Sequence, residues 1–393
     1  MKAYKTEIHP SQTQIELIHK TFGCTRYIYN QYVYENLENL TSGKDFISAF
    51  SYSKRVNNDP NTPSWLKEVP SKAVKQALIY AERAFKDYFS KRNGKPKFKK
   101  KGTNDSFYLI GTLKVERHRI FVPVLKWVRL KEFGYIPEKI NSVTISMKNG
   151  RYYISCLCKE EKDERIALSK DSMGIDFGLK DQFITEDRVI PSINRSLRIK
   201  KLEQSLRREQ RCLSRRIEAN MIERVYYQRG AKKGQLKSFQ WVKPLSECRN
   251  IQKQKKKVAQ IHERLTRIRT DYNRKALLSL VLERKPSSIT IENLSIRNLM
   301  KNRHLSAAIM KAQWYQSRFY LENLCNRLGI ELRVVDRFYP SSKLCSTCGF
   351  KYKDLKLNQR FWTCSNCGSE HDRDRNAAIN LGRCIDYTVL TAV

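Results

Sequence analysis

The stretch SMGIDFGL, residues Ser172 to Leu179, is a short apolar run interrupted by one acid, Asp176. Its first part, Ser172 to Phe177, has the pattern of a buried β-strand. Asp176 lies at the end of this strand, where the flanking glycines would let a large ligand approach the backbone. A single acid at a strand end is more often an ordinary capping group, so Asp176 by itself defines no site.

Two later stretches also place acids at the ends of elements. SITIENL, Ser288 to Leu294, is another β-rich run, and Glu292 ends its strand. HDRDRNAAINL, His371 to Leu381, places Asp372 and Asp374 just before a helix-like run. Each acid has the same ordinary explanation as the first. Together, in a chain that must hold a polyanion, acids at strand and helix ends make sense if they bind divalent cations.

A very basic segment separates the first two acids. From Arg195 to Lys275 there are 25 basic and 7 acidic residues, a net charge of 25 − 7 = +18 in 81 residues. Apolar residues recur at intervals of three, four or seven, so residues 195–285 are expected to form an antiparallel helical hairpin inserted in an α/β domain. A merely solvated coiled coil would carry mixed charge signs, so this excess favours contact with nucleic acid. The residues expected to make it are Arg207, Arg208, Lys255, Lys256 and Lys257.

Four of the eleven cysteines form two CxxC pairs separated by fifteen residues. Each pair can bind one side of a tetrahedral zinc ion, and Gly349 and Gly368 follow the pairs, as turns whose amides approach thiolates tend to require. Four cysteine ligands leave no open position for catalysis, so a structural zinc ribbon is expected at residues 340–370. Its ligands would be Cys345, Cys348, Cys364 and Cys367.

The N-terminal part combines strand-like and helix-like patterns. Residues 1–10 and 103–165 are expected to form a small antiparallel barrel or sheet, including a hairpin that turns at Asn149-Gly150. Residues 11–102 have helical patterns, which would make them an insertion within the β domain. The charged residues 159–165 are expected to link this part to the next.

One segment of the helical block is dense in positive charge. Between Lys91 and Lys101, seven of eleven residues are basic, with Gly94, Pro96 and Phe98 interleaved. A charge run is usually a solvated face, but Gly and Pro favour an extended backbone whose lysines track phosphates. The lysines expected to do so are Lys95, Lys97, Lys99, Lys100 and Lys101.

The charge of the whole chain limits its partners. The 393 residues include 77 Lys and Arg and 39 Asp and Glu, for a net charge of +38. Neutralising that charge takes about 19 base pairs, so long nucleic acid is expected rather than a nucleotide or a phosphopeptide. No apolar run is long enough to span a bilayer, and no membrane partner is expected. Without a secretory signal, the expected location is intracellular, in the cytoplasm or nucleoid.

The order of GIDFGL, IENL, CxxC, CxxC and DRDRNAAINL resembles the TnpB family of transposon-encoded RNA-guided nucleases, relatives of type V CRISPR effectors. The resemblance extends over essentially the whole chain and includes GKPKFKKKG, residues 94–102, and PSSKLCSTCG, residues 340–349. It implies a multidomain α+β protein. The implied parts are a wedge-like β domain at 1–10 and 103–165, a helical recognition domain at 11–102, and a RuvC-like, ribonuclease H-type nuclease domain at 166–393.

The resemblance also implies a reaction. The catalytic acids would be Asp176, Glu292 and Asp374, the last preferred to Asp372 because the family's third acid stands two residues before Asn376. They would hold two Mg²⁺ ions about 4 Å apart, with Asp176 bridging them, to hydrolyse DNA that pairs with a guide RNA beside a short flanking motif.

The expected partners are therefore a guide RNA and double-stranded target DNA, and the expected cofactors are two magnesium ions and one structural zinc ion. Two alternatives stay open: a repressor that binds RNA-directed DNA without cutting it, and a DDE-type transposase that joins strands. A miniature CRISPR effector would share the same chemistry.

Overall fold

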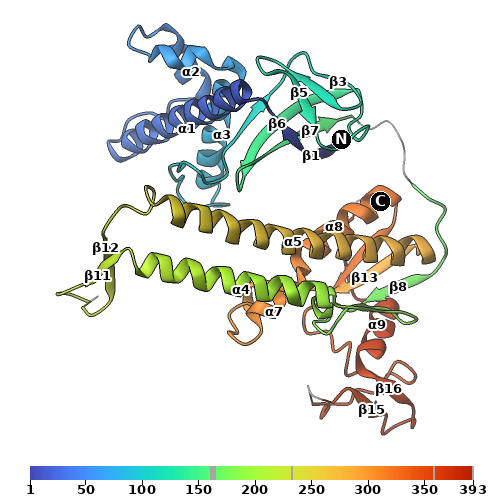
Figure 1. Cartoon of the computed structure of the whole chain (residues 1–393). Coiled ribbons are helices and arrows are strands. Elements are labelled where there is room, and N and C mark those ends of the chain that lie inside the picture. The colour runs from blue at the N-terminus through green and yellow to red at the C-terminus, as the bar shows by residue number, and fades with distance from the viewer. Residues whose placement is uncertain (160–164, 232, 357–358, 392–393) are drawn as a thin grey trace. The chain divides into compact units, whose positions relative to one another are not determined.

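The computed structural model of the protein describes residues 1–159, 165–231, 233–356 and 359–391. The chain divides into two compact units, Met1–Lys162 and Asp163–Val393 (Figure 1). Most of the linker expected at 159–165 lies outside the described residues. No helix in the described part of the chain is both long and apolar enough to cross a membrane.

The first unit contains a seven-stranded antiparallel sheet in the order β2-β6-β7-β1-β5-β4-β3. β6 and β7 form the expected hairpin, whose turn places Asn149 and Gly150 at φ angles of 53° and 75°. β2 and β3 are the end strands, so the described residues form an open sheet, and the expected closure into a barrel is not confirmed. The strands are β1 (Lys2–His9), β2 (Ser106–Leu109), β3 (Lys114–Val115), β4 (Arg119–Val122), β5 (Lys126–Leu130), β6 (Ile140–Lys148) and β7 (Arg151–Cys158).

Three helices are inserted between β1 and the rest of this sheet, because β1 pairs with β5 and β7, which come much later in the chain. Ile18 and Phe22 of the first helix pack with Ile145 in the core of the sheet. Tyr32 and Phe85 belong to a second core, formed among the helices themselves. The helices are α1 (Gln12–Thr41), α2 (Ala49–Asn58) and α3 (Ser71–Phe89).

The second unit is built on a four-stranded sheet in the order β17-β14-β13-β8. β8, β13 and β14 are parallel, and β17 is antiparallel to β14. Just after β8, Asp176 exchanges backbone hydrogen bonds of 2.9 and 3.0 Å with Ile184 of β9, and β9 pairs with β10. The strands are β8 (Ser172–Ile175), β9 (Asp181–Ile184), β10 (Val189–Pro191), β13 (Ser288–Glu292), β14 (Glu331–Val335) and β17 (Thr388–Val389).

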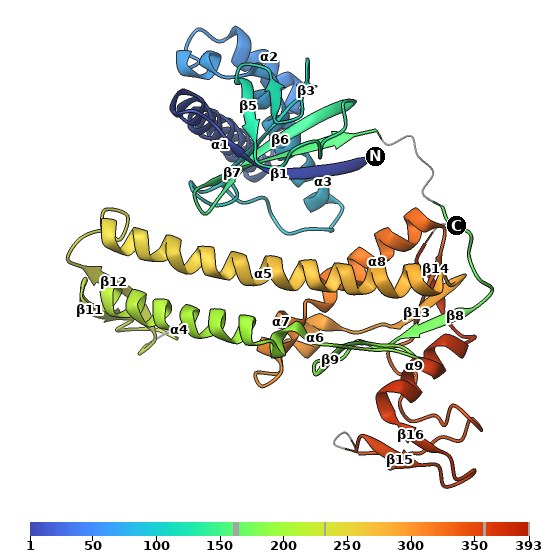
Figure 2. The same ribbon diagram turned by 45° about the vertical axis from the view of Figure 1, so that its right-hand side comes forward.

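Helices cover both faces of this sheet (Figure 2). Side chains alternate along a strand, so Met173 and Ile175 of β8 share a core with α5 and α8. Val335 of β14 instead packs with Leu381 of α9. The helices are α4 (Leu197–Glu218), α5 (Arg249–Arg284), α6 (Ile296–Leu299), α7 (Ser306–Ala312), α8 (Trp314–Leu328) and α9 (Arg373–Arg383).

Two smaller hairpins complete the second unit. α4 and α5 lie side by side (Figures 1 and 2), with Leu206 and Leu265 buried between them. The chain between these helices forms strands β11 (Met221–Tyr226) and β12 (Leu236–Trp241), which the sequence analysis did not predict. A second pair, β15 (Phe361–Thr363) and β16 (Glu370–Asp372), leads directly into α9.

The glycines beside Asp176 have a different role from the one expected. A Cβ atom added to Gly174 would lie 1.9 Å from the carbonyl oxygen of Ala378 in α9, and one added to Gly178 would lie 2.3 Å from that of Asp181. Both glycines therefore admit the chain's own backbone rather than a ligand. Gly174 is the point at which α9 rests directly on β8.

The contact between β8 and α9 makes a stability prediction. We expect Gly174→Ala to lower the free energy of unfolding by about 3 kcal/mol, because backbone atoms on both sides must move to admit one methyl group. Gly23→Ala in α1 is the control, since among the described residues no atom outside the surrounding helix backbone lies within 4 Å of its added Cβ, and alanine favours a helix. Urea-induced unfolding measures both variants. An unchanged midpoint for Gly174→Ala would mean that α9 does not rest on β8.

Candidate active site

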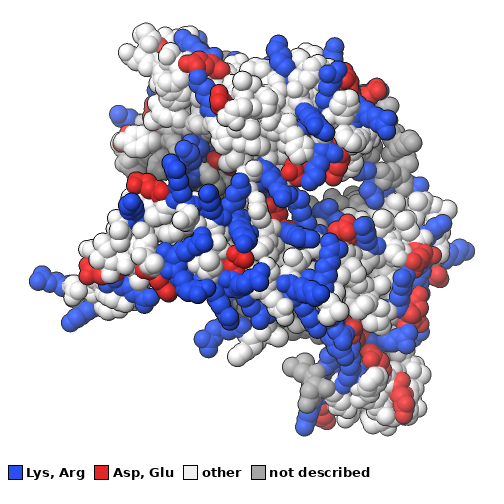
Figure 3. All heavy atoms as spheres, viewed as in Figure 1, with Lys and Arg blue, Asp and Glu red and all other residues white. Residues whose placement is uncertain are grey.

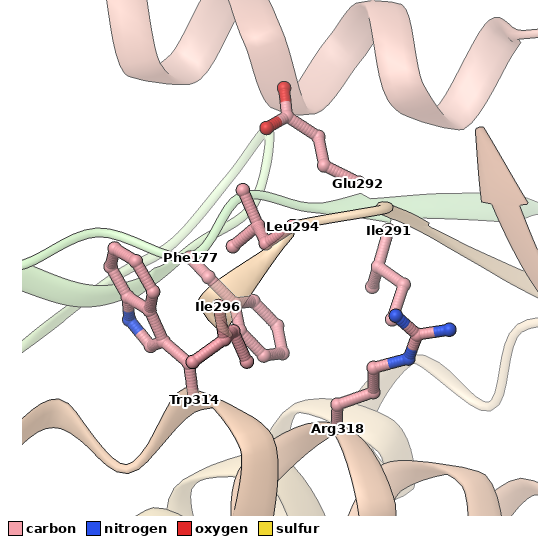
Figure 4. A pocket seen from close by; sticks show the side chains of 7 residues that line it. All are labelled: Phe177, Ile291, Glu292, Leu294, Ile296, Trp314 and Arg318. Atoms are coloured by element: carbon pink, nitrogen blue, oxygen red, sulfur yellow. The ribbon is translucent and has the colours of Figure 1, made fainter. Parts of the chain in front are cut away.

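Two of the predicted acids lie next to each other at the ends of parallel strands. Ile175 of β8 is in register with Ile291 of β13, so the next residues, Asp176 and Glu292, are level. Figure 4 shows Ile291 and Glu292 pointing to opposite sides of β13, with the Glu292 carboxylate directed away from the apolar side chains of the pocket drawn there. Strand pairing thus places both acids on the face that α9 covers.

The third acid comes from the first turn of α9. Asp372 is the N-cap of this helix, and its carboxylate accepts hydrogen bonds of 3.0 Å from the backbone N–H groups of Asp374 and Arg375. Asp374 lines a cavity of about 190 Å³ together with Asp176 and Glu292. The structure therefore brings the three predicted acids to one cavity and gives Asp372 a capping role.

The acids share this cavity at an electrostatic cost. Burial, and then the charges of Glu292 and Asp374, raise the pKa of Asp176 to about 8. Burial also raises the pKa of Glu292, although its hydrogen bond from Ser341 acts in the opposite direction. A divalent cation would relieve this repulsion, and carboxylate oxygens are the ligands that Mg²⁺ prefers. The donor set therefore fits magnesium.

Arginines balance the charge of the third acid. The guanidinium of Arg360, just before β15, lies 3.1 Å from Asp374, 2.7 Å from Asp181 and 3.8 Å from Asp372. Arg373 lies 3.3 Å from the other carboxylate oxygen of Asp374. Among the described residues, the three acids are not a group whose ligand atoms all lie within 4.8 Å of one another. Because Arg360 contacts both Asp374 and Asp181 of β9, it links the third acid to β9 in this structure.

A serine and two asparagines connect the acids to the CxxC loop. The Ser341 hydroxyl donates to the Glu292 carboxylate. Asn380 of α9 donates to the carbonyl oxygens of Ser341 and Leu344 at 2.8 and 2.7 Å, and Asn376 donates to that of Leu344 at 2.6 Å. Sequence reasoning missed these roles, although both stretches, PSSKLCSTCG and DRDRNAAINL, had been noted.

For the magnesium-dependent DNA cleavage that the family resemblance implies, we expect Ser341→Ala to raise the Mg²⁺ concentration needed for half-maximal cleavage by about tenfold. The variant loses a hydrogen bond to a charged group, which is worth at least about 1.5 kcal/mol, and leaves Glu292 with a higher pKa. Cleavage is measured across a series of Mg²⁺ concentrations. Ser342→Ala is the control. Ser342 lines the same cavity, but the hydroxyl that donates to Glu292 is that of Ser341. If both variants needed the same Mg²⁺ concentration for half-maximal cleavage, Ser341 would not be the residue that orients Glu292 for metal binding.

The four predicted cysteines meet in one place. Among the described residues, their sulfur atoms form the group whose ligand atoms all lie within 4.8 Å of one another. Two of the Sγ–Sγ distances are 3.6 Å, between Cys345 and Cys367, and 3.7 Å, between Cys348 and Cys364. A tetrahedron with Zn–S bonds of about 2.3 Å has edges of about 3.8 Å. The cluster therefore fits a structural zinc ion.

The surroundings of this cluster shift the pKa values of its thiols in opposite directions, because burial raises the pKa of Cys345 to about 11. Gly349 and Gly368 have φ angles of 74° and 72°, and their N–H groups bond back to the carbonyls of the first cysteine in each pair. Hydrogen bonds from Ser369 lower the pKa of the Cys367 thiol to about 6. His371 Nε2 lies 3.1 Å from the sulfur of Cys345. The turns expected from the two glycines are confirmed.

Comparisons with known proteins agree with these motifs. Residues 314–381 match the family described as Cas12f1-like, TNB domain, and residues 1–45 match one described as a helix-turn-helix domain. The chain is 31% identical, over 394 residues, to a protein from Streptomyces pristinaespiralis named as an RNA-guided DNA endonuclease. That similarity covers 97% of this chain and 88% of the relative. The chain belongs to the TnpB family.

Other TnpB relatives and structures extend the likeness. The RNA-guided DNA endonuclease InsQ of Escherichia coli K12 is 27% identical over 404 residues, which cover 97% of this chain and 91% of InsQ. A solved structure titled as the mini-RNA-guided endonuclease CRISPR-Cas_phi3 has a TM-score of 0.51 at 12% identity, covering 97% of this chain and 92% of that one. The second likeness concerns the fold alone. In this TnpB chain, residues 1–45 consist mainly of β1 and α1.

Both groups of predicted nucleic-acid contacts in this TnpB chain lie largely on the surface. In the first unit, Lys95, Lys97, Lys100 and Lys101 are exposed, and the Lys99 ammonium lies 4.1 Å from the centre of the Tyr29 ring. In the second unit, Lys and Arg side chains gather over α4 and α5 (Figure 3). There, Lys255 is half-buried and the exposed residues are Arg207, Arg208, Lys256 and Lys257.

Proposed function

We propose that this protein is an RNA-guided DNA endonuclease encoded by a transposon. It carries a guide RNA and cleaves complementary double-stranded DNA next to a short flanking motif. The observation that supports this most directly is the cavity shared by Asp176, Glu292 and Asp374, which lies beside a cluster fit for structural zinc. The names of the relatives point to the same activity.

The catalytic acids of this proposal would hold two magnesium ions. When bound, magnesium supplies an activated water and stabilises negative charge on the leaving 3′ oxygen. Ser341 orients Glu292, and the Asp372 cap orients the helix that carries Asp374. Lys343 and Lys356 line the same cavity and attract the phosphodiester backbone.

The domain roles follow the same proposal. A wedge-like domain at 1–10 and 103–165 and a recognition domain at 11–102 would grip guide RNA and target duplex. Residues 166–393 would form a RuvC-like nuclease of the ribonuclease H type. The parallel strands β8, β13 and β14 with helices on both faces support this assignment. The ribbon at 340–370 would brace the site and help to load the substrate strand.

Co-purified RNA tests the proposed function. The protein is purified from its host, the bound RNA is sequenced, and the complex is incubated with a DNA library of randomised flanks, with Mg²⁺ or with EDTA. Double-strand breaks are expected only with Mg²⁺, only in DNA that matches the RNA, and beside one flanking motif. A protein that carries no RNA would overturn the proposal.

The same experiment separates the alternatives. Joined donor and target ends would identify a DDE-type transposase, and guide-dependent binding without breaks would identify a repressor. The presence of all three acids around one cavity favours cleavage over repression.

We expect Lys97→Ala/Lys100→Ala/Lys101→Ala to reduce the salt dependence of guide-RNA binding. Each phosphate contact contributes about 0.7 to the slope of log affinity against log salt for single strands, so three lysines account for about 2. Binding is measured at a series of salt concentrations. Lys275→Ala is the control, because the Lys275 ammonium lies 2.9 Å from Asp271 in the same helix. An unchanged slope would exclude these lysines as phosphate contacts.

A further inference from the structure

The β11–β12 hairpin stands at the end of the α4–α5 pair opposite the four-stranded sheet (Figures 1 and 2). Its strands, Met221–Tyr226 and Leu236–Trp241, pair antiparallel with two irregularities in register. It is not a simple helix-to-helix connection, because thirty residues, 219–248, join α4 to α5, whereas such connections usually take about two to eight residues. The activity proposed above assigns it no role.

This hairpin has no core of its own. Among the described residues, none of those in the seven hydrophobic clusters belongs to β11 or β12. Ile222 is 63% exposed, Leu236 is 44% exposed and Phe239 is 40% exposed. An isolated two-stranded hairpin is marginally stable in water. A partner that covers these side chains would stabilise it.

The charge of the hairpin indicates an anionic partner. From Met221 to Lys243 the sequence has six basic residues and one acidic residue. The described basic side chains in this range are all exposed: Arg224, Arg229, Lys233, Lys237 and Lys243. In Figure 3 the hairpin projects with Lys and Arg on its surface. A polyanion matches this pattern, whereas an apolar protein surface would leave the cations without partners.

Aromatic rings are interleaved with these cations. Phe239 and Trp241 lie two residues apart on one strand, and their ring centroids are 5.2 Å apart with an angle of 31° between the planes. Arg224 is the register partner of Phe239, so it lies on the same face. The ammonium of Lys237, near the start of β12, lies 6.0 Å from the centre of the ring of Tyr227, the residue after β11. Rings beside cations suit a strand whose bases stack while its phosphates face the charges.

Stacking selects the kind of nucleic acid. Paired bases keep their faces covered within a duplex, so only an unpaired segment offers them to Phe239 and Trp241. A hairpin without a core also benefits from a partner that stays bound, and in the proposed function the guide RNA is held throughout while the target DNA is transient. The combination favours RNA over DNA.

We propose that the β11–β12 hairpin binds an unpaired segment of the RNA that the protein carries. Bases stack on Phe239 and Trp241, and phosphates face Arg224 and Lys237. This rests on the proposed function for the identity of the RNA. It adds a contact surface that lies apart from the cavity of the three acids, because none of the residues lining that cavity belongs to the hairpin.

Ultraviolet crosslinking of the co-purified RNA–protein complex locates this contact. The expected result is a nucleotide attached to a peptide that contains Phe239 and Trp241. Phe239→Leu/Trp241→Leu keeps apolar side chains but removes the rings, and it should weaken RNA binding about tenfold and abolish that crosslink. Phe239→Tyr/Trp241→Phe keeps the rings and should restore both.

Two controls keep a folding defect apart from a lost contact. Ser238→Ala/Gln240→Ala alters the alternate positions of the same strand, which face the other side, and should bind RNA as the parent does. If the leucine variant binds RNA normally, apolar packing is sufficient and the stacking contact is refuted. Crosslinks to the target DNA alone, or to a co-purified protein, would also overturn the inference while leaving the endonuclease intact. Absence of any bound RNA would overturn both proposals.

Discussion

Asp176→Asn is expected to lower guide-dependent DNA cleavage by about 10³-fold or more while guide-RNA binding stays at the parental level. Asp176 lies at the end of β8, level with Glu292 and facing the same cavity as Asp374. Asp176 would be one of the residues that hold Mg²⁺, and losing a charged ligand would remove several kcal/mol of transition-state stabilisation, where each 1.4 kcal/mol is a factor of ten in rate.

The same variant should not be less stable than the parent in EDTA. The pKa of Asp176 is raised to about 8, so without metal its charged form is disfavoured in the folded chain. A carboxyl with a raised folded pKa contributes stability below its unfolded pKa and loses it as pH rises through the folded value. Above pH 8, Asp176 of the metal-free parent is therefore charged and is repelled by Glu292 and Asp374, whereas Asn at this position carries no charge. Thermal unfolding in EDTA at pH 8.5 should give the variant an equal or higher midpoint.

Asp171→Asn is the matched control for this experiment. Asp171 is an exposed acid immediately before β8 and does not line the cavity. It should cleave like the parent. Retained cleavage by Asp176→Asn in Mg²⁺ would remove Asp176 from the active site, and a lower midpoint in EDTA would mean that the loss of activity reports misfolding.

The structure brings the three predicted acids to one cavity and the four predicted cysteines to one cluster, and both sets stand in short, recognisable stretches of sequence. Two CxxC pairs carry their ligand geometry in their spacing, and Glu292 ends an apolar run that can only be a short strand or a buried helix. Parallel pairing of β8 and β13 then places Asp176 and Glu292 side by side, because parallel strands in register bring their carboxyl ends together.

The supporting contacts could not be predicted because they depend on tertiary approach. Asn380 binds main-chain carbonyls 36 and 39 residues away, and nothing in an Asn side chain specifies such partners. Gly174 shows the same limit. Its sequence context suggested access for a ligand, but the element that packs against it because it has no Cβ is α9, some two hundred residues later in the chain.

The β11–β12 hairpin was missed for another reason. Its strands carry exposed aromatic, aliphatic and basic residues, so neither face has the apolar alternation that marks a half-buried strand. In the first unit, the strand-like patterns of residues 1–10 and 103–165 predicted a sheet or barrel, but such patterns contain no information on whether the end strands β2 and β3 meet. Sequence pattern therefore predicts which residues face a core better than it predicts whether a sheet closes at its end strands.

Cys364→Ser is expected to abolish stoichiometric zinc binding and to lower DNA cleavage by about a hundredfold or more. A structural zinc site supplies folding energy directly, so a ribbon with three thiolates loses its fold rather than one contact. Cys364 follows β15, and β15 pairs with β16, whose last residue is Asp372, the N-cap of α9. Disorder at the cysteine cluster therefore reaches the helix that carries Asp374.

Zinc content by elemental analysis and cleavage with the bound guide RNA are measured on the same preparations. Cys212→Ser is the control, because Cys212 lies in α4, outside the cluster, and should retain both zinc and activity. Guide-RNA binding should persist in both variants, since the lysines at 95–101 belong to the first unit. Full cleavage by a zinc-free Cys364→Ser protein would contradict the bracing role, because the contacts of Asn376, Asn380 and Ser341 would then hold the acids without a bound zinc ion.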